Sequence, residues 1–289
     1  MKVGVVGNPR YADLKAVLQQ LSREAPSRGI SLVTEPSLTP LWDLNLPLLD
    51  EVPVDALLTF GGDGTLLRGM RLLNGREAPI LGVNFGRVGF LTTADRDGLI
   101  PALDALVSGR YVLERRLVLI ASIISDGGGV RSEQMALNDV AIHKSGVARV
   151  IRVRVTVDGE NVGPYSADGI VVATPTGSTA YSLSAGGPIV VPGVEAMIVT
   201  PVCAHTLAVR PLVVPADSVI CIEPLAPGTD DILLSYDGQV GTMLALGDSV
   251  YVRRAPSAAL LIRIGEEGYF SRMRQKLGWG DLSEREVIR

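Results

Sequence analysis

The chain has 289 residues, of which 47% are hydrophobic and 20% are charged. This composition is typical of a globular protein with one or two cores, and it excludes a disordered chain. The net charge of −4 argues against a protein that binds nucleic acid or an anionic membrane by long-range attraction. The longest apolar stretches, such as Val118–Ile124, are shorter than the roughly 20 residues of a membrane-spanning helix. Residues 1–9 lack the pattern of a secretory signal, so we expect a cytoplasmic protein.

The first hundred or so residues alternate segments typical of strands with segments typical of helices. Apolar runs predict strands over Lys2–Gly7, Ile30–Val33, Val54–Phe60 and Ile80–Val83. Apolar residues at helical spacing predict helices over Ala12–Glu24, Gly64–Leu73 and Asp97–Val107. The Pro- and Leu-rich segment Leu38–Glu51 predicts an irregular connection. This order predicts a parallel sheet covered by helices, and hence an α/β domain over residues 1–109.

From about Arg110 onwards, short segments rich in Val and Ile recur between turns. Ile151–Val157 alternates apolar and polar residues and is closed by Asp158-Gly159, which predicts a β-hairpin. Further strands are predicted over Gly169–Ala173, Ser218–Glu223, Ile232–Tyr236, Ser249–Arg253 and Leu260–Ile264. We expect a β-rich, sandwich-like domain over residues 110–267, which makes the fold α+β overall. A helical pattern returns at Tyr269–Leu277, so residues 268–289 are expected to form a C-terminal helix that packs back on the first domain.

Cysteine and histidine are rare in this chain. Cys203 and Cys221 are the only cysteines and lack CxxC spacing, so free thiols are their expected state. His143 and His205 are the only histidines, which excludes a metal site built from several histidines. The sequence therefore predicts no metal ion that is ligated by protein side chains alone.

The sharpest local motif is Phe60-Gly61-Gly62-Asp63-Gly64-Thr65, which joins a buried strand to a helix. Open α/β sheets bind ligands at this edge, and glycine amides at a helix start favour phosphate groups. A carboxylate is repelled by phosphate, so Asp63 is expected to accept a hydrogen bond from a nucleophilic hydroxyl or to bind Mg²⁺. The alternative is a tight turn in which Asp63 caps the helix.

Two further motifs carry polar groups that could bind a ligand. The segment Asp168–Pro188 places hydroxyl groups at a short helix between Gly-rich turns, and Tyr181 could stack on a base. A capped helix in a Ser- and Thr-rich turn is the alternative for this segment. The pair Asn138-Asp139 stands at a strand start, where it could bond a base edge and a ribose diol or form an Asx turn.

Taken together, these motifs resemble the NAD kinase family over nearly the whole chain. The matching segments are GGDGT at 61–65, Gly89-Phe90-Leu91, Asn138-Asp139, Asp168–Pro188, CAHTLAVRPLV at 203–213 and Asp237-Gly238-Gln239. GGDGT alone is weakly specific, because lipid kinases and phosphofructokinases have similar turns. The TGSTAYSLSAGGP block behind it, in the right order, is specific to the family.

The resemblance implies phosphorylation of the adenosine 2′-hydroxyl of NAD to give NADP, with ATP or in some members polyphosphate as donor. It implies a divalent cation, Mg²⁺ or Mn²⁺, that accompanies the nucleotide, and a homodimer or homotetramer whose pockets are completed by the neighbouring subunit. Asp63 falls at the position of the general base. Donor phosphates would be held by Gly61, Gly62, Gly64, Thr65 and Arg68. The positions that match NAD-binding residues are Phe90, Asn138, Asp139, Arg149, Ser166, Asp168, Thr179, Ala180, Tyr181, Ser182, Leu183, Ser184 and Gln239.

Two positions depart from the family pattern. Asp139 stands where the family usually has Glu, so its reach toward the ribose is one methylene shorter. Ser166 stands where several members carry a basic residue, which removes one charge contact. His205 and Arg210 lie in a matching segment, and we interpret them as structural or subunit-contact residues.

Two other functions compete with this hypothesis. A lipid kinase of the diacylglycerol type shares the Gly-Gly-Asp-Gly turn, but it should carry basic or apolar features for a membrane surface, which an acidic chain does not favour. A non-catalytic NAD(P)-binding sensor is the second alternative, although binding alone gains nothing from Asp63 beside phosphates.

Overall fold

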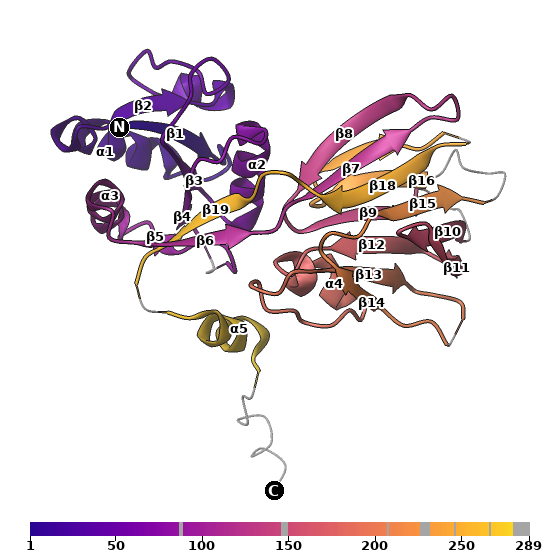
Figure 1. Ribbon diagram of the computed structural model, residues 1–289. Helices are drawn as coiled ribbons and strands as arrows, with labels where there is room; N and C mark the ends of the chain where they lie inside the picture. Colours follow the sequence, from indigo (N-terminus) through magenta and orange to yellow (C-terminus); the bar gives the residue numbers. More distant parts are fainter. Residues whose placement is uncertain are drawn as a thin grey trace, which may run out of the picture. The chain divides into compact units, whose positions relative to one another are not determined.

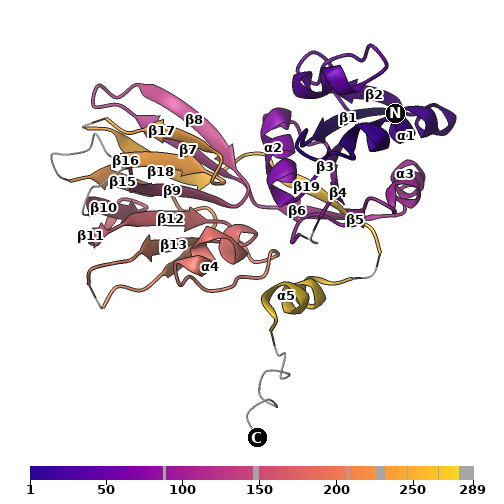
Figure 2. The ribbon, with the colours of Figure 1, turned by 180° about the vertical axis from the view of Figure 1, so that it is seen from behind.

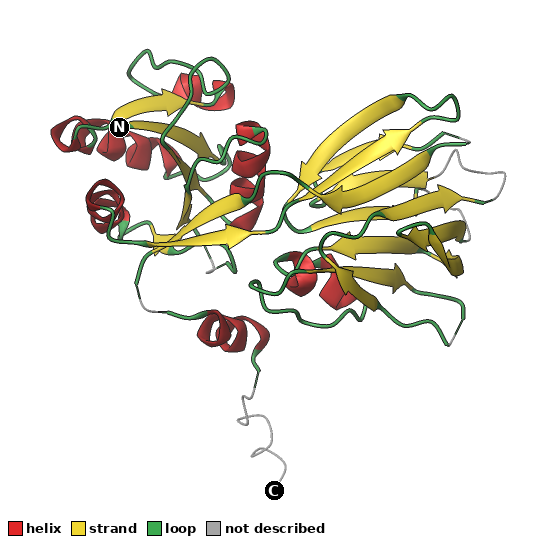
Figure 3. Ribbon diagram, in the orientation of Figure 1, coloured by secondary structure: helices red, strands yellow, loops and turns green. Residues whose placement is uncertain are grey.

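The computed structural model describes residues 1–86, 89–145, 150–206, 208–225, 232–245, 247–265 and 267–279 (Figures 1 and 3). The chain divides into two compact units. The first comprises Met1–Arg115 together with the chain from Ala259 onwards, and the second comprises Arg116–Ala258.

The first unit is built on a mainly parallel sheet whose described strands run in the order β2-β1-β3-β4-β19-β6, with β5 beside β4. The strands are β1 (Lys2–Gly7), β2 (Ser31–Thr34), β3 (Ala56–Phe60), β4 (Ile80–Asn84), β5 (Ala94–Asp95), β6 (Val112–Arg116) and β19 (Ala259–Arg263). The helices are α1 (Leu14–Glu24), α2 (Asp63–Leu73), α3 (Leu99–Ser108) and α5 (Tyr269–Leu277), with short 3₁₀ segments at Pro26–Arg28 and Pro36–Leu41. Figure 2 shows this unit from behind.

The core of the first unit forms because its central strands are apolar on both faces. All five residues of β3 are buried, as expected for a parallel strand covered on both sides. Helix α1 buries one stripe, Leu14, Val17, Leu18 and Leu21, against this core. The predicted α/β architecture with a parallel sheet is confirmed.

The boundary between the units differs from the expected positions, residues 110 and 267. Strand β19, expected in the β-rich half, pairs in parallel with β4 through Leu261 and Ile80. Strand β6 flanks β19 in the same sheet. A short apolar run has the same pattern in a parallel or an antiparallel sheet, so its sequence does not identify its partner.

The second unit contains two antiparallel sheets, each of six strands in the part of the chain that the structure describes. One sheet consists of β11 (Glu160–Ala167), β10 (Ile151–Val157), β15 (Ile220–Pro224), β18 (Ser249–Arg254), β7 (Leu119–Ile124) and β8 (Val130–Ala136), in that order. The other consists of β14 (Leu212–Pro215), β13 (Ala196–Val202), β12 (Gly169–Ala173), β9 (Asp139–Lys144), β16 (Ile232–Tyr236) and β17 (Val240–Met243). The short helical segments η3 (Gly177–Thr179) and α4 (Tyr181–Ser184) follow β12.

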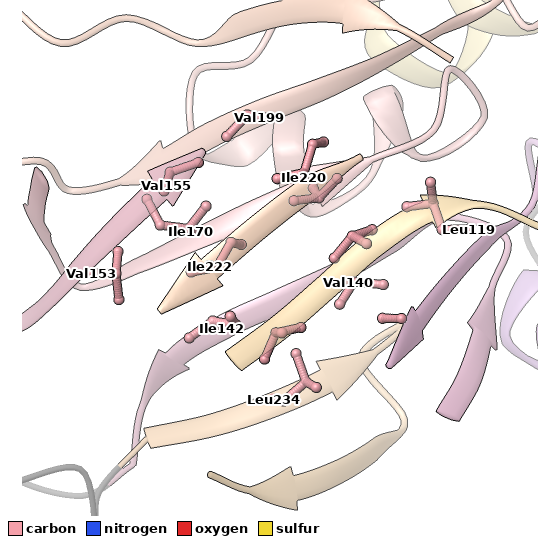
Figure 4. Close-up of a cluster of buried hydrophobic side chains, with 14 of the residues drawn as sticks. Leu119, Val140, Ile142, Val153, Val155, Ile170, Val199, Ile220, Ile222 and Leu234 are labelled. Carbon is pink, nitrogen blue, oxygen red and sulfur yellow. The ribbon is translucent and has the colours of Figure 1, made fainter. Parts of the chain in front are cut away.

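Side chains from both sheets form one shared apolar core. Val153 and Ile222 come from the first sheet, and Ile142 and Ile170 come from the second (Figure 4). The alternation along β10 buries every second residue in its first half, which gives the sandwich its inner face. The predicted sandwich-like β domain is confirmed.

The Asp158-Gly159 turn forms as predicted between β10 and β11. Both residues take positive φ, 52° for Asp158 and 82° for Gly159, as a tight hairpin turn of this type requires. In the described residues, no helix is long and apolar enough to span a membrane.

Candidate active site

The GGDGT loop lies at the carboxyl edge of the sheet in the first unit, where β3 ends and α2 begins. The Gly61 N–H donates to the Val83 carbonyl at the end of β4, at 2.9 Å. A Cβ atom at Gly61 would lie 2.2 Å from Thr65 Oγ1, so no larger residue fits there. Helix α2 starts at Asp63 with Gly62 as its N-cap, and its first turn supplies amides suited to an anion.

The Asp63 carboxylate is held by three consecutive backbone amides. Phe90 N–H donates to Oδ2 at 2.8 Å, and the N–H groups of Leu91 and Thr92 donate to Oδ1 at 3.1 and 3.3 Å. A Cβ atom at Gly89 would lie 1.8 Å from Oδ1, so glycine is needed beside the carboxylate. Asp63 therefore does not cap its own helix; its orientation is fixed by the 89–92 segment.

The Arg68 side chain forms an ion pair near the carboxyl ends of β1 and β2. Its Nη1 and Nη2 donate to the two carboxylate oxygens of Glu35 at 2.7 and 2.9 Å, and Nη2 also donates to the Gly7 carbonyl. Glu35 is buried, and it accepts a further bond from the Gly7 N–H at 2.8 Å. The guanidinium is thus engaged in joining β1, the end of β2 and α2. Sequence reasoning missed Glu35, which carries no motif of its own.

The second unit contains a cavity of about 570 Å³ that is lined by both polar and apolar groups. Its lining residues are Asn138, Asp139, His143, Ala180, Tyr181, Leu233, Ser235, Asp237, Gly238, Gln239 and Gly241. Five of the predicted NAD-binding positions, Asn138, Asp139, Ala180, Tyr181 and Gln239, are thereby brought to one place.

The acidic centre of this cavity is the pair Asp139 and Asp237. Asp237 accepts bonds from the N–H groups of Leu137, Asn138 and Asp139 at 3.2, 2.7 and 3.3 Å. The Asp139 side chain is 4% exposed. Burial first, and then the nearby charge of Asp237, raise the pKa of Asp139 from 3.8 to about 7. The carboxyl can therefore gain or lose a proton near neutral pH.

The turn after β12 packs directly on Asn138. The Thr174 N–H donates to the Asn138 carbonyl at 2.9 Å, and Thr174 Oγ1 donates to the Leu137 carbonyl at 2.6 Å. A Cβ atom at Gly177 would lie 2.0 Å from the Asn138 carbonyl oxygen, so this approach requires glycine. The TPTG sequence thus fixes the backbone on which the Asn138 and Asp139 side chains stand.

Tyr181 begins helix α4 and contributes its ring to the cavity wall. The ring is exposed. Desolvation first, and then Cys203, Asp139 and Asp168, raise the pKa of the Tyr181 phenol. An exposed aromatic face beside a cavity is suited to stacking on a base.

Other predicted NAD-binding residues do not line this cavity. Asp168 forms an ion pair with Lys144 at 2.9 Å. Thr179 Oγ1 donates a hydrogen bond to the Thr176 carbonyl. The Ser166 carbonyl accepts a hydrogen bond from the His205 N–H. Leu183 is half-buried and Ser184 is exposed on α4, whereas Phe90 is half-buried in the first unit. Arg149 lies outside the described residues.

The structure does not support the predicted NAD-binding role of the Ser182 side chain. Its side chain is fully buried, and its hydroxyl forms a hydrogen bond of 2.9 Å with Thr200 Oγ1 on β13. A hydroxyl in this position holds α4 to the sheet and is not available to a ligand. The Ser-rich sequence could not distinguish this residue from its neighbours, because four residues form only one turn.

His143 and Ser235 were missed as cavity residues, although their register could have indicated them. His143 lies opposite Leu233, and Ala141 lies opposite Ser235, in the antiparallel pairing of β9 and β16. Residues two apart on a strand share a face, so these side chains share the face of Asp139. The His143 Nδ1 atom lies 3.1 Å from the Lys144 carbonyl, which requires it to carry the proton. In the neutral ring, Nε2 is then a hydrogen-bond acceptor.

The α/β unit carries a glycine and aspartate loop and the antiparallel β unit carries a cavity with polar side chains, an arrangement that suits a two-domain nucleotide-binding phosphotransferase. Residues 3–111 match the family described as the ATP-NAD kinase N-terminal domain, and residues 137–264 match the ATP-NAD kinase C-terminal domain. The chain therefore belongs to the NAD kinase family.

Similar proteins extend over nearly the whole chain. An NAD kinase of Gemmatimonas aurantiaca is 48% identical over 286 residues, which is 99% of each chain. An NAD kinase of Geotalea daltonii is 38% identical and covers 92% of this chain and 94% of its own.

Two solved structures have the same fold. Yeast NADH kinase complexed with NADH has a TM-score of 0.88 at 27% identity, covering 97% of this chain and 88% of its own. An NAD kinase from Archaeoglobus fulgidus in complex with ATP has a TM-score of 0.74 at 28% identity, covering 96% of this chain and 99% of its own.

Proposed function

We propose that this chain transfers the γ-phosphoryl group of ATP to the adenosine 2′-hydroxyl of NAD, giving NADP and ADP. The family membership supports the overall reaction, as do the ATP and NADH that the similar solved structures contain. The observation that carries the mechanism is the Asp63 carboxylate, which stands at the start of helix α2 and is held by the amides of Phe90, Leu91 and Thr92.

Asp63 acts as the general base in this proposal. Its Oδ2 accepts the bond from Phe90, and a carboxylate oxygen has a second acceptor direction, which would receive the hydroxyl proton. The 2′-oxygen then forms its bond to the γ-phosphorus while the bond from that phosphorus to ADP breaks. Phosphoryl transfer depends mainly on positioning and charge stabilisation, so a fixed carboxylate and a phosphate-binding loop suffice from the chain.

The donor phosphates bind to the GGDGT loop in this proposal, at Gly61, Gly62, Gly64 and Thr65. The Gly61 N–H donates to the Val83 carbonyl and the Thr65 N–H to the Gly62 carbonyl, so these two residues shape the turn rather than donate their amides to phosphate. The four loop residues form the turn and the first turn of α2, where the helix dipole favours negative charge. We assign Arg68 a supporting part, because Glu35 already neutralises its charge. A divalent cation that enters with the nucleotide would neutralise phosphate charge.

NAD binds through its adenosine to the cavity of the second unit in this proposal. The Asn138 amide would bond the base edge, the Asp139 carboxylate would accept from the ribose diol, and Tyr181 would stack on the base. We keep Gln239 and Ala180 as further contacts, since both line the cavity. Roles for Phe90, Arg149, Ser166, Asp168, Thr179, Leu183 and Ser184 rest on the family resemblance.

A homodimer or homotetramer in the cytoplasm completes the proposal. Both edges of the cavity-bearing sheet expose apolar side chains, Val213 on β14 and Met243 on β17, which suits association through these edges. Sedimentation equilibrium of the purified chain measures its assembly state, and a monomer at micromolar concentration contradicts the oligomer.

The activity is tested by incubating the purified chain with NAD, ATP and Mg²⁺ and measuring NADP. Asp63→Asn should lower kcat by at least about 100-fold, the loss expected for a general base. Asp97→Asn is the matched control, because its side chain is 92% exposed. Calorimetric binding of NAD by both variants checks that each is folded.

Other outcomes would overturn parts of this proposal. Equal NADP formation by the wild type and Asp63→Asn would remove the general base. NAD binding without phosphorylation by ATP or polyphosphate would favour a sensor. Phosphorylation of diacylglycerol in vesicles instead of NAD would favour a lipid kinase.

A further inference from the structure

Helix α5 contacts the rest of the first unit through an unusual residue. Among its nine residues only Arg272 is buried, at 6% exposure, whereas Phe270, Leu277 and the following Trp279 are exposed. Apolar burial therefore does not explain the position of this helix. The Arg272 Nη1 atom donates to the Phe90 carbonyl at 2.9 Å, which joins α5 to the segment beside Asp63.

Among the residues that the structure describes, the buried Arg272 guanidinium has no counter-charge. No carboxylate in the described part of the chain forms an ion pair with it, and its Nε atom is buried without a hydrogen-bond partner. Arginine stays protonated in proteins, and a buried unpaired charge is costly.

The acceptor of this bond connects Arg272 to Asp63 through a single peptide group. The Phe90 carbonyl and the Leu91 N–H belong to the same peptide unit, and the Leu91 N–H donates to Asp63 Oδ1 at 3.1 Å. A trans peptide directs its C=O and N–H in opposite directions, so the cation and the carboxylate lie on opposite sides of it. A cation that bonds the oxygen polarises the peptide and strengthens the N–H as a donor.

We propose that Arg272 is a positioning residue for phosphoryl transfer, which strengthens, through the Phe90–Leu91 peptide, the hydrogen bond that orients Asp63. The proposal rests on the proposed role of Asp63 as general base. Arg272 touches neither substrate in it. Its loss should lower the rate of the chemical step and leave substrate binding almost unchanged, because it acts on the orientation of one carboxylate.

The peptide link can be observed directly by NMR. The chain has four Phe residues, and only Phe90 is followed by Leu, so labelling with ¹³C′-Phe and ¹⁵N-Leu gives one carbonyl-to-amide cross-peak. In Arg272→Met this Leu91 amide proton should move upfield, as expected for a weaker hydrogen bond. Arg274→Met is the matched control, since Arg274 is an exposed arginine of the same helix. An unmoved peak in Arg272→Met overturns the proposal.

Kinetics test the consequence for the reaction. Arg272→Met should lower kcat about tenfold with both KM values within about twofold of wild type, and Arg272→Lys should recover part of the loss by keeping the cation. Unchanged kcat with raised KM values, or equal losses in the Lys and Met variants, overturns the proposal. A failure of the proposed function can be told apart from a failure of the Arg272 proposal. If Asp63 is not the general base, Asp63→Asn retains full activity, whereas the NMR shift in Arg272→Met still reports whether the peptide link exists.

Discussion

Replacing Asp139 by Asn should stabilise the protein, and the gain should grow with pH. Burial and the Asp237 charge raise the pKa of Asp139 from 3.8 to about 7. The folded state therefore holds a proton that the unfolded state releases between about pH 4 and pH 7, and stability falls as pH rises through this window. Above about pH 7 both states are ionised, and the loss is constant.

The size of the effect follows from the pKa change. A rise of about three units at 1.36 kcal/mol per unit gives an upper limit of roughly 4 kcal/mol. Asparagine has nearly the same shape as the protonated acid and never ionises, so Asp139→Asn escapes this loss. The difference between variant and wild type should be small at pH 4.5 and largest at pH 8.

The assay is the melting temperature of the ligand-free protein, measured by calorimetry at intervals from pH 4.5 to pH 8.5. One kcal/mol corresponds to about 2–4 °C for a chain of 150–250 residues, so a gain of several degrees at pH 8 is expected. Asp217→Asn is the control in the same unit, because its side chain is 87% exposed. A difference in melting temperature that stays constant with pH, or shrinks as pH rises, would refute the reasoning.

Three further predictions concern both units. Arg68→Ala should destabilise the chain by about 3 kcal/mol, because it leaves Glu35 buried without its cation; a melting temperature within 1 °C or so of wild type would contradict this. Tyr181→Ala should raise the KM for NAD about tenfold and change the KM for ATP less, whereas Tyr181→Phe keeps the ring; the opposite order would mean that the two binding sites are assigned the wrong way round. Gly89→Ala should lower kcat by at least about tenfold, because its Cβ displaces the Asp63 carboxylate; steady-state kinetics with unchanged kcat would show that this carboxylate position is not required.

The local elements were predictable because their signals are local. Strands β10 and β16 lie at their expected ranges, since alternation and turn residues depend on near neighbours in the chain. Helix α5 covers the helical pattern at Tyr269–Leu277, and residues 280–289 of the expected helix 268–289 lie outside the described part of the chain. The Asp158-Gly159 hairpin followed from the positive φ that its turn requires. Pairing between distant strands has no such signal, and β19 was accordingly placed in the wrong sheet.

The sequence by itself determined the family, the two kinds of domain and the motifs that carry the chemistry, because motif residues and their order are written directly in the chain. Only the tertiary structure decided what each polar group contacts. It placed the Asp63 carboxylate on the amides of residues 90–92, engaged Arg68 with Glu35, buried Ser182 against Thr200 and joined Arg272 to Phe90. These contacts join residues that are distant in the chain. The packing of strands and helices determines which residues meet.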